Sequence, residues 1–358
     1  MQLHFDIPFV RTIEVLDTHT EGNPTRIILG GEFVPQGLTL RESYEWLKSN
    51  DDQLRRILNF EPRGNPMMCS VMLIPPSTSD FEADFGAIIM EQDEYVPMCG
   101  HCIIGAATAV ARLGLLGAAK PAEAVRFETL AGLVTCAVAI ESPASATWVT
   151  ITNAPSFVLH RNKLVSLSDG RELRVDVAFG GDFYAIVDAK DVAVEISPDN
   201  EGELGRIARL VTEAVNAQLS IQHPTDVAID KCYEVLFEDS DRVGLGFRHV
   251  VVSPPGILDR SPCGTGTSAR LASLFLRGEI VVGQEYTFEG VMGTRFHAMV
   301  SEVGLVRDIP TIVPKIRGRG FITGHSTLYL EPEDPFPNGL RIQSRPPPSS
   351  SVGNTQRR

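Results

Sequence analysis

The sequence has few cysteines, an excess of negative over positive charge and no long apolar segment. Its 358 residues include six cysteines at irregular spacing, so we expect no disulfide framework. The net charge of −13 argues against a nucleic-acid partner, because such binding needs Lys and Arg to neutralise phosphates. No apolar run approaches the roughly 18–20 residues of a membrane helix, and the first residues lack a signal-peptide pattern. These absences predict a cytoplasmic protein with neither a nucleic-acid nor a membrane partner.

The length of the chain favours two domains, because single hydrophobic cores stop growing near about 250–300 residues. The order of strands, one apolar helix and more strands occurs twice, which we interpret as a distant internal duplication. We predict a first half over residues 1–165, with strands near 310–330 available to complete it, and a second half over 166–330. Residues 331–358 are rich in Pro, Ser and Asn, and we predict a disordered tail there.

A Cys-Gly pair stands at the corresponding point of each half. Cys99-Gly100 and Cys263-Gly264 both precede a stretch of small apolar residues that is typical of a buried helix. A thiol at a helix N-terminus lies in a positive field that stabilises its thiolate, and the free N–H groups there can hold a carboxylate. Glycine lets a ligand approach the backbone closely. Two such ends facing each other would place an acid and a base on opposite sides of an amino acid, as inversion of a carbon requires.

Other interpretations of these cysteines stay open. Cys99 and Cys102 form a C-x-x-C, which in thioredoxin-like units is a redox-active dithiol. The flanking residues do not indicate such a unit, and a dithiol would leave Cys263 unexplained. A zinc site is disfavoured because there is no second pair of cysteines or histidines at suitable spacing, so we expect no metal. Each thiol could also be a buried structural cysteine.

Polar residues near the two corners are further candidates. Asp259 could accept a hydrogen bond from a substrate ammonium, or it could cap the helix or pair with Arg260. His101 could orient a substrate or be a core histidine. Polar residues end a predicted strand over 17–22, and two glycines lie in 180–184. Both segments are typical of ligand contacts, with a capped turn and a β-bulge as the structural alternatives.

These residues resemble the motifs of the proline racemase family. Residues 98–101, Met-Cys-Gly-His, match its first active-site motif, and residues 259–267, Asp-Arg-Ser-Pro-Cys-Gly-Thr-Gly-Thr, match its second. The resemblance implies an α/β (α+β) fold of two pseudo-symmetric halves, similar to diaminopimelate epimerase. Each half would be a curved mixed sheet or barrel around a central helix, with the active site in the cleft between them. It also implies an isomerase that inverts Cα of a small proline-type imino acid without a cofactor. A homodimer is left open as an assembly.

The resemblance implies a role for each matched residue. Cys99 and Cys263 would be the catalytic acid and base: one thiolate removes the α-proton and the opposite thiol returns one to the other face. Five residues beside them would bind the substrate: Gly100, His101, Asp259, Gly264 and Thr265. The last two would offer backbone N–H groups to its carboxylate.

The substrate depends on three specificity positions, at Cys69, Ser253 and Glu234. Proline racemases tend to have bulky aromatics at two of these positions, which are Cys69 and Ser253 here. A buried hydroxyl without a partner costs about 1–3 kcal/mol, so a small polar pocket favours 4-hydroxyproline 2-epimerase, with proline racemase as the first alternative. Cys263 argues against a trans-3-hydroxyproline dehydratase, in which threonine replaces this cysteine. The chain departs from the family pattern at Cys102, where glycine or asparagine is more usual, and near Glu234, where a histidine is expected in an epimerase. A non-catalytic imino-acid-binding protein is the alternative from another class.

Overall fold

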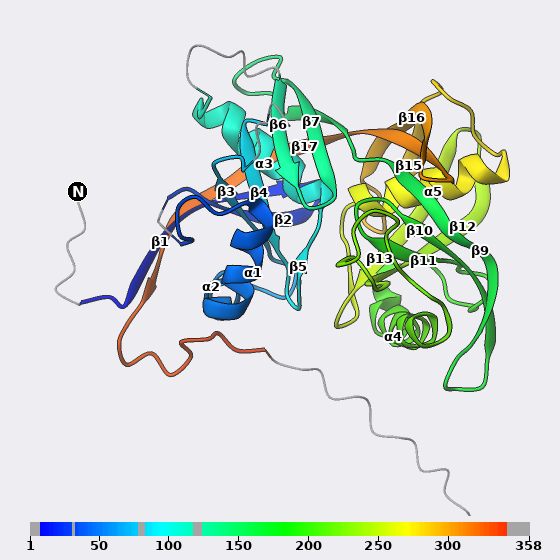
Figure 1. The fold of residues 1–358 in the computed structure, drawn as a ribbon, viewed down its shortest axis with the longest axis horizontal. Helices are drawn as coiled ribbons and strands as arrows, with labels where there is room; N and C mark the ends of the chain where they lie inside the picture. The colour runs from blue at the N-terminus through cyan, green and yellow to red at the C-terminus, as the bar shows by residue number, and fades with distance from the viewer. Residues whose placement is uncertain (1–7, 31–32, 78–82, 117–123, 342–358) are drawn as a thin grey trace, which may run out of the picture.

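The computed structural model describes residues 8–30, 33–77, 83–116 and 124–341. Two halves lie side by side, each with strands around one central helix, α3 (Gly100–Leu113) in the first half and α5 (Gly264–Arg277) in the second (Figure 1). The strands form one hydrogen-bonded sheet that curves through both halves. The predicted α+β fold of two pseudo-symmetric halves is therefore confirmed. Within the described ranges, no helix has both the length and the apolar character needed to cross a membrane.

The first half encloses α3 in strands and carries two short helices on its outside. Its elements are β1 (Arg11–Thr20), β2 (Asn23–Ile28), α1 (Leu40–Asn50), α2 (Asp52–Asn59), β3 (Cys69–Ile74), β4 (Phe85–Met90), β5 (Tyr95–Val96), α3, β6 (Ala124–Thr129), β7 (Gly132–Ala139) and β8 (Thr147–Thr152). The residues of α3 from Gly100 to Val110 are all buried, as their small and uncharged composition predicts. Helices α1 and α2 pack on β4 and β3. Thr39 and Glu42 form a capping box that begins α1.

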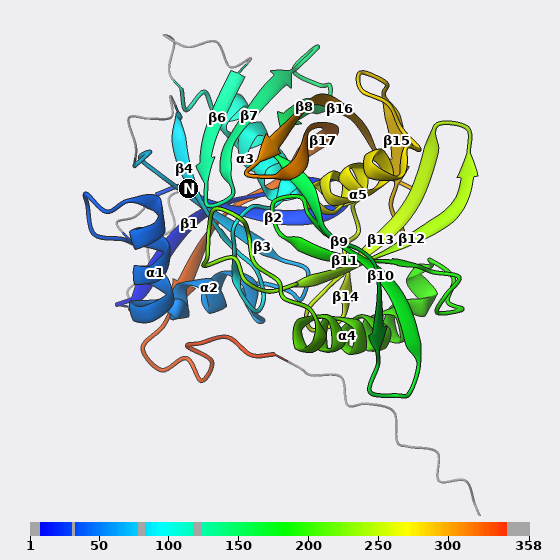
Figure 2. The same cartoon turned by 45° about the vertical axis from the view of Figure 1, so that its right-hand side comes forward.

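The second half encloses α5 in the same way. Its elements are β9 (Ser156–Ser166), β10 (Glu172–Phe179), β11 (Phe183–Asp188), a 3₁₀ turn (Pro198–Asn200), α4 (Glu201–Gln218), β12 (Glu234–Val243), β13 (Gly246–Ser253), β14 (Ile257–Leu258), α5, β15 (Tyr286–Glu289), β16 (Arg295–Val306) and the first part of β17 (Ile309–Leu330). Helix α4 packs on β12 and β13 from outside, as α1 and α2 do in the first half (Figure 2).

The strand order of the first half recurs in the second. Strand β2 pairs in parallel with β3, β3 pairs antiparallel with β4, and β4 pairs in parallel with β6. In the same way β11 pairs in parallel with β12, β12 pairs antiparallel with β13, and β13 pairs in parallel with β15. A two-residue strand, β5 or β14, then pairs with β4 or β13 ahead of each Cys-Gly corner. This recurrence matches the duplication that we inferred from the sequence.

Strand β17 joins the two halves. Its first part pairs with β16 and β9 in the second half, and its last part pairs with β8 and β1 in the first half. Figure 1 shows this long strand, in orange, running from one half to the other. The pairing with β1 extends from Thr20↔Gly320 to Arg11↔Leu330, so the end of β17 completes the sheet of the first half.

Two boundaries differ from the sequence-based prediction. Strand β9 pairs with β10 and buries Phe157 and Val165 in the second core, so it belongs to the second half and not to a first half ending at residue 165. The predicted disordered tail is wrong for residues 331–341. There the N–H of Leu340 donates to the Glu61 carbonyl at 2.6 Å, and further ion pairs tie the segment to the first half. Residues 342–358 lie outside the described residues.

Candidate active site

The N-termini of α3 and α5 abut at two glycines. A Cβ on Gly100 would lie 2.6 Å from the Cα of Gly264, and a Cβ on Gly264 would lie 2.7 Å from the Cα of Gly100. Any larger residue would push the helices apart, since packed backbones leave no spare volume. Cys99 and Cys263 are the N-cap residues of these helices. The glycines therefore serve the contact between the two helices, which the sequence analysis did not foresee when it assigned them to ligand approach.

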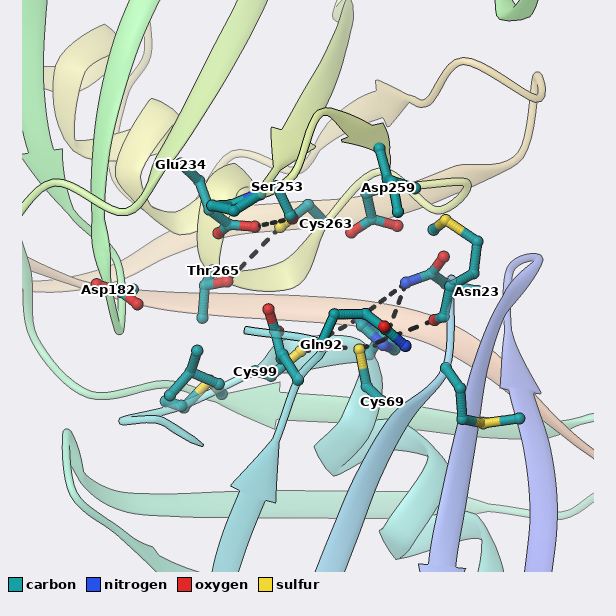
Figure 3. A pocket seen from close by; sticks show the side chains of 18 of the residues that line it. Asn23, Cys69, Gln92, Cys99, Asp182, Glu234, Ser253, Asp259, Cys263 and Thr265 are labelled. Atoms are coloured by element: carbon teal, nitrogen blue, oxygen red, sulfur yellow. Dashed lines mark hydrogen bonds between the residues drawn. The ribbon is translucent and has the colours of Figure 1, made fainter. Parts of the chain in front are cut away.

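Both cysteines line one small cavity between the halves (Figure 3). Its volume is about 40 Å³, so only a compact ligand fits. The predicted site residues that line it are Cys69, Cys99, His101, Glu234, Ser253, Asp259, Cys263 and Thr265. Gly100 and Gly264 lie behind this wall, at the contact between the helices.

Cys99 lies beside a histidine. Its Sγ is 3.2 Å from Nδ1 of His101, and the Sγ of Cys102 is 3.5 Å from Nε2 of the same ring. Burial lowers the pKa of His101 to about 4, so the imidazole is neutral at pH 7. A hydrogen bond with Cys102 lowers the pKa of Cys99, but burial and the nearby Glu91 outweigh it and raise that pKa to about 12. The Cys99 thiol is therefore protonated at pH 7, within hydrogen-bond distance of a neutral imidazole.

Cys263 has a different environment. Its backbone φ of 56° lies in the left-handed region, which costs a residue with a side chain about 1–3 kcal/mol. In this conformation its Sγ accepts a hydrogen bond from the N–H of Gly266 at 3.3 Å. The hydroxyls of Tyr184 and Thr265 each lie 3.6 Å from the sulfur. Burial and the charge of Asp259 raise the pKa of Cys263 well above its usual value, so this thiol is also protonated at pH 7. The surrounding donors can stabilise a thiolate when one forms.

Four carboxyl groups line the cavity: Asp182, Glu234 and Asp259, which are buried, and Glu91, which is half-buried. Among the described residues that line it, none is Lys or Arg. Burial raises the pKa of Asp182 to about 8 and that of Asp259 to about 7, and it also raises the pKa values of the two glutamates. Such a wall favours a ligand that brings positive charge or hydrogen-bond donors, because either one compensates buried carboxylates.

Two of these carboxyl groups have fixed orientations. The Ser253 hydroxyl donates a hydrogen bond to Oε1 of Glu234, and both side chains face the cavity (Figure 3). Asp259 accepts hydrogen bonds from the N–H and the hydroxyl of Ser261 at 2.8 and 2.9 Å. Ser253 and Glu234 thus form a polar pair on one wall, and Asp259 is held next to the Cys263 corner.

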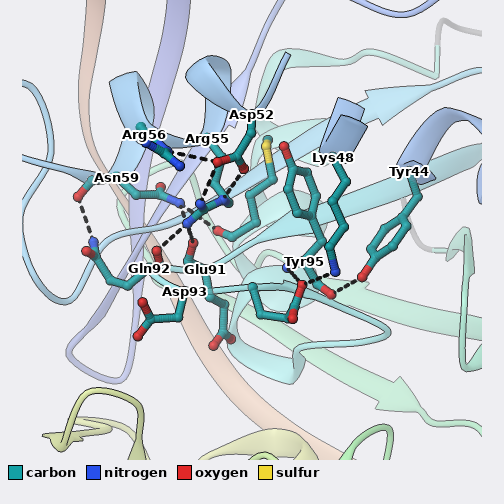
Figure 4. A network of polar contacts seen from close by, with 12 residues as sticks. Tyr44, Lys48, Asp52, Arg55, Arg56, Asn59, Glu91, Gln92, Asp93 and Tyr95 are labelled. Atoms are coloured by element: carbon teal, nitrogen blue, oxygen red, sulfur yellow. Dashed lines mark hydrogen bonds and ion pairs between the residues drawn. The ribbon is translucent and has the colours of Figure 1, made fainter. Parts of the chain in front are cut away.

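Glu91 and Gln92 also reach the cavity, although the sequence analysis did not select them. They follow β4, and α2 fixes their backbone (Figure 4). Arg55, which pairs with Asp52 at 2.7 Å, donates to the carbonyls of Glu91 and Gln92. Asn59 donates to the Glu91 carbonyl at 3.2 Å. The sequence did contain a sign of this, since a run of polar residues directly after a buried strand is a common place for ligand contacts.

Ion pairs join the halves beside the cavity. Glu94 lies 2.6 Å from Lys48 of α1 and 2.7 Å from Lys231 of the second half. Burial raises the pKa of Glu94, but the two lysines outweigh this effect and lower the pKa to about 2. Arg41 of α1 forms a second pair across the cleft, with Asp226.

Three metal-ligating side chains gather at the Cys99 end of the cavity. The Sγ atoms of Cys69 and Cys102 and a ring nitrogen of His101 all lie within 4.8 Å of one another, and the three residues are buried. The sequence analysis saw only the local C-x-x-C when it disfavoured a metal. Cys69 belongs to β3 and precedes Cys99 by thirty residues in the sequence. The spacing of the cysteines therefore could not reveal that these side chains form one cluster.

Known proteins resemble the chain over nearly its whole length. The sequence model of the family described as proline racemase matches residues 15–341. The chain is 39% identical to a 4-hydroxyproline 2-epimerase of Streptosporangium roseum, over 93% of this chain and 99% of that protein. It is 36% identical to a proline racemase of Clostridioides difficile, over 94% and 99%. A solved hydroxyproline epimerase from Agrobacterium vitis, with bound trans-4-hydroxy-L-proline, has a TM-score of 0.86 at 32% identity and covers 93% of this chain and 96% of that one.

The fold, the two helix N-termini and these similarities agree with one another. The two-half architecture is that of the solved relative, and the family match spans both Cys-Gly corners. This chain belongs to the proline racemase family.

Proposed function

We propose that this chain is a cofactor-independent epimerase that inverts Cα of 4-hydroxyproline. The observation that carries the proposal is the position of Cys99 and Cys263, at abutting helix N-termini and in the wall of one small cavity. A carbon held between two such groups can lose a proton from one face and gain one on the other. Relatives that are named 4-hydroxyproline 2-epimerase, at 39% and 33% identity, support this choice of substrate.

The reaction needs one thiolate and one thiol. The thiolate takes the α-proton, and the electron pair of the broken C–H bond spreads into the substrate carboxylate. The opposite thiol then gives its proton to the other face of Cα, and that electron pair forms the new C–H bond. The first cysteine ends as a thiol and the second as a thiolate, so the reverse reaction starts from the opposite protonation state. Nδ1 of His101 lies 3.2 Å from the Cys99 sulfur, so the imidazole would share a hydrogen bond with this sulfur and orient it during the reaction.

The substrate carboxylate would lie against the two helix N-termini. The hydrogen-bond ladder of α3 begins with the Ile103 N–H bonded to the Cys99 carbonyl, and that of α5 begins with the Thr267 N–H bonded to the Cys263 carbonyl. The N–H groups of Gly100, His101, Gly264 and Thr265 precede these bonds and are outside the ladders. Oriented N–H groups of this kind bind a carboxylate and stabilise the negative charge that develops on it in the transition state.

The carboxyl groups account for the rest of the substrate. Asp259 and Asp182 are placed to accept hydrogen bonds from the ring ammonium, which also compensates their buried charge. The Ser253–Glu234 pair offers a donor and acceptor for the ring hydroxyl. Proline is the alternative substrate, since a relative at 36% identity is named proline racemase. A pocket with a part-buried polar pair favours the hydroxylated ring, because proline would leave that pair without a ligand partner.

Incubation in heavy water tests the proposal. Trans-4-hydroxy-L-proline should take up deuterium at Cα and yield cis-4-hydroxy-D-proline, whereas L-proline should react more slowly. Replacing Ser253 by Ala should reduce the preference for hydroxyproline over proline by about tenfold, since one hydrogen bond is lost. An absence of exchange with every proline derivative would reject the epimerase. A higher kcat/KM for L-proline would instead identify proline as the substrate.

A further inference from the structure

We propose that Cys69, Cys99, His101 and Cys102 bind a thiophilic cation such as Zn²⁺, and that occupation of this site inhibits the enzyme. The inhibition rests on the proposed function, but cation binding does not. The Sγ atoms of Cys69 and Cys102 and a ring nitrogen of His101 lie within 4.8 Å of one another. With Zn–S bonds of about 2.3 Å, tetrahedral coordination places two sulfur ligands about 3.8 Å apart, so small side-chain movements suffice.

Cys99 is the nearest candidate for the fourth ligand. Its Sγ lies 3.2 Å from Nδ1 of His101 and 4.0 Å from Nε2, and the Cys102 Sγ lies 3.5 Å from Nε2. Sulfur and nitrogen ligands of one tetrahedral zinc ion are separated by about 3.5 Å. Measured to Nε2 alone, the Cys102 separation of 3.5 Å equals this value and the Cys99 separation of 4.0 Å exceeds it, so the Cys99 sulfur has to move closer to bind the ion.

Rigid elements hold the four side chains. Cys99 is the N-cap of α3, and His101 and Cys102 belong to its first turn, which is fully buried. Cys69 begins β3 and is paired in register with Thr25 of β2, whose hydroxyl is 3.8 Å from the Cys102 sulfur. Ligands fixed by a helix and a neighbouring strand lose little freedom on binding an ion, and such preorganisation favours affinity.

The substrate cavity offers a path for the cation. Cys69, Cys99 and His101 line it, and so do the four carboxyl groups described above. A cavity lined by acidic groups and by no Lys or Arg among the described lining residues attracts cations. Soft thiolate and imidazole ligands then select zinc or copper(I) over magnesium or calcium, which prefer oxygen.

Binding is coupled to proton release and blocks proton transfer at Cys99. Each coordinating thiol gives its proton to solvent, and the neutral imidazole donates a lone pair, so no oxidant or reductant is needed. A Cys99 sulfur whose lone pair is bonded to the ion can neither remove the α-proton nor deliver one. Removal of the ion by a chelator restores the free thiol.

Calorimetric titration of the metal-free chain with Zn²⁺, under a phosphine reductant, tests the binding. We expect one ion per chain, and affinity at least about tenfold weaker in Cys69→Ala and in Cys102→Ala. Cys136→Ala is the matched control, because Cys136 is a buried cysteine of β7 outside the cluster, and it should bind as the native chain does. Absence of binding, or equal affinity in all three variants, would overturn the proposal.

Cobalt spectroscopy of the native chain decides the case even if a variant fails to fold. Co²⁺ bound by these residues should show thiolate-to-metal charge transfer and tetrahedral d–d bands, and a spectrum of octahedral oxygen coordination would overturn the site.

Activity is measured separately: Zn²⁺ should inhibit epimerisation reversibly, at concentrations at least about tenfold higher in Cys102→Ala. A chain that binds Zn²⁺ but epimerises no substrate would reject the proposed function and leave the binding site standing. Zn²⁺ binding to an active enzyme without inhibition would overturn the inhibitory role.

Discussion

The two Cys-Gly corners occupy equivalent positions but give their thiols different partners. Cys99 has extended backbone and an imidazole nitrogen at 3.2 Å. Cys263 has a φ of 56°, a backbone N–H at 3.3 Å and the hydroxyls of Tyr184 and Thr265 at 3.6 Å. One thiol therefore lies against an imidazole, and the other lies against a backbone N–H donor and two hydroxyls. The comparison shows that the helix N-terminus fixes the position of each thiol. The residues around each thiol determine which hydrogen bonds it makes.

The same contrast runs through the cavity wall. In the parallel register of the first half Thr25 pairs with Cys69, and in that of the second half Tyr184 pairs with Glu234. These registers, together with the alignment of Cys99 on Cys263, place each residue of the first half at an equivalent position of the second. The equivalent residues that line the cavity are Asn23 and Asp182, Cys69 and Glu234, Glu91 and Ser253, and His101 and Thr265. At the matched positions 69/234 and 101/265, the first half thus has a thiol and an imidazole where the second half has a carboxyl group and a hydroxyl. A duplicated fold has kept the positions and changed the chemistry.

Removing either thiol should have the largest effect. Cys99→Ser and Cys263→Ser should each lower kcat/KM for epimerisation by about 10²–10⁴-fold, because a serine hydroxyl is a far weaker acid and base at these positions. Polarimetry and deuterium exchange at Cα give the measurement. Cys136→Ser, away from the cavity, is the control. If one of the two active-site variants kept native activity, the two-thiol mechanism would be wrong.

Separating the two corners should have the next largest effect. Gly100→Ala places a Cβ 2.6 Å from the Gly264 Cα and should displace the helix ends. We expect a loss of stability of about 1–3 kcal/mol from overpacking and a loss of activity of about 10²-fold from misplaced groups. Gly202→Ala in α4 is the control, because nothing lies within 4 Å of its added Cβ. Native kcat/KM in Gly100→Ala would show that contact between the helix ends is dispensable.

Neutralising one carboxylate at a time should lower the pKa of one thiol and leave that of the other unchanged. Asp259→Asn removes a charge that raises the pKa of Cys263, so alkylation of Cys263 by iodoacetamide should begin at lower pH. Glu91→Gln should do the same for Cys99, whose pKa that glutamate raises. Peptide mass spectrometry across a pH series reports each cysteine separately. An equal shift of both cysteines in either variant would contradict the assignment of a separate environment to each thiol.

The pH dependence of stability should reveal the buried acid of the second half. Asp182 has a folded-state pKa of about 8, raised by burial, against about 3.9 in an unfolded chain. Its contribution to stability is therefore complete below about pH 4 and is lost as pH rises through 8. Asp182→Asn should flatten the decline of the melting temperature between pH 5 and 8. The exposed Asp191→Asn is the control, and an unchanged decline in Asp182→Asn would contradict the prediction.

The ion pairs beside the cavity should matter least. Glu94→Gln loses contacts with Lys48 and Lys231, whose side chains are half exposed, so we expect a loss of at most about 1 kcal/mol at pH 7. The folded-state pKa of Glu94 is about 2, so its stabilisation is present above the unfolded pKa of about 4.3 and fades as pH falls towards 2. Urea unfolding from pH 7 to 3 measures the difference from the native chain. A difference that grows at low pH would be inconsistent with this pair.

The sequence by itself determined the parts of the site that are local in the chain. The two Cys-Gly corners, His101 and Thr265 follow from residues next to the start of a buried helix, because capping and helix-end electrostatics act within one turn. The repeated order of strands and helices also follows from local hydrophobic patterns. These patterns were sufficient to predict two similar halves, each with a cysteine at the start of its central helix.

Only the tertiary structure decided which distant residues share the cavity. Cys69 reaches Cys102 through the pairing of β3 with β2, Glu91 is placed by α2, and β17 draws the following residues 331–341 onto the first half. No pattern in the sequence fixes these contacts, because they depend on the register between strands and on side chains that meet from far apart in the chain. The side chains that line the cavity, including the cluster of thiols, are therefore brought together by the packing of strands and helices that are distant in the sequence.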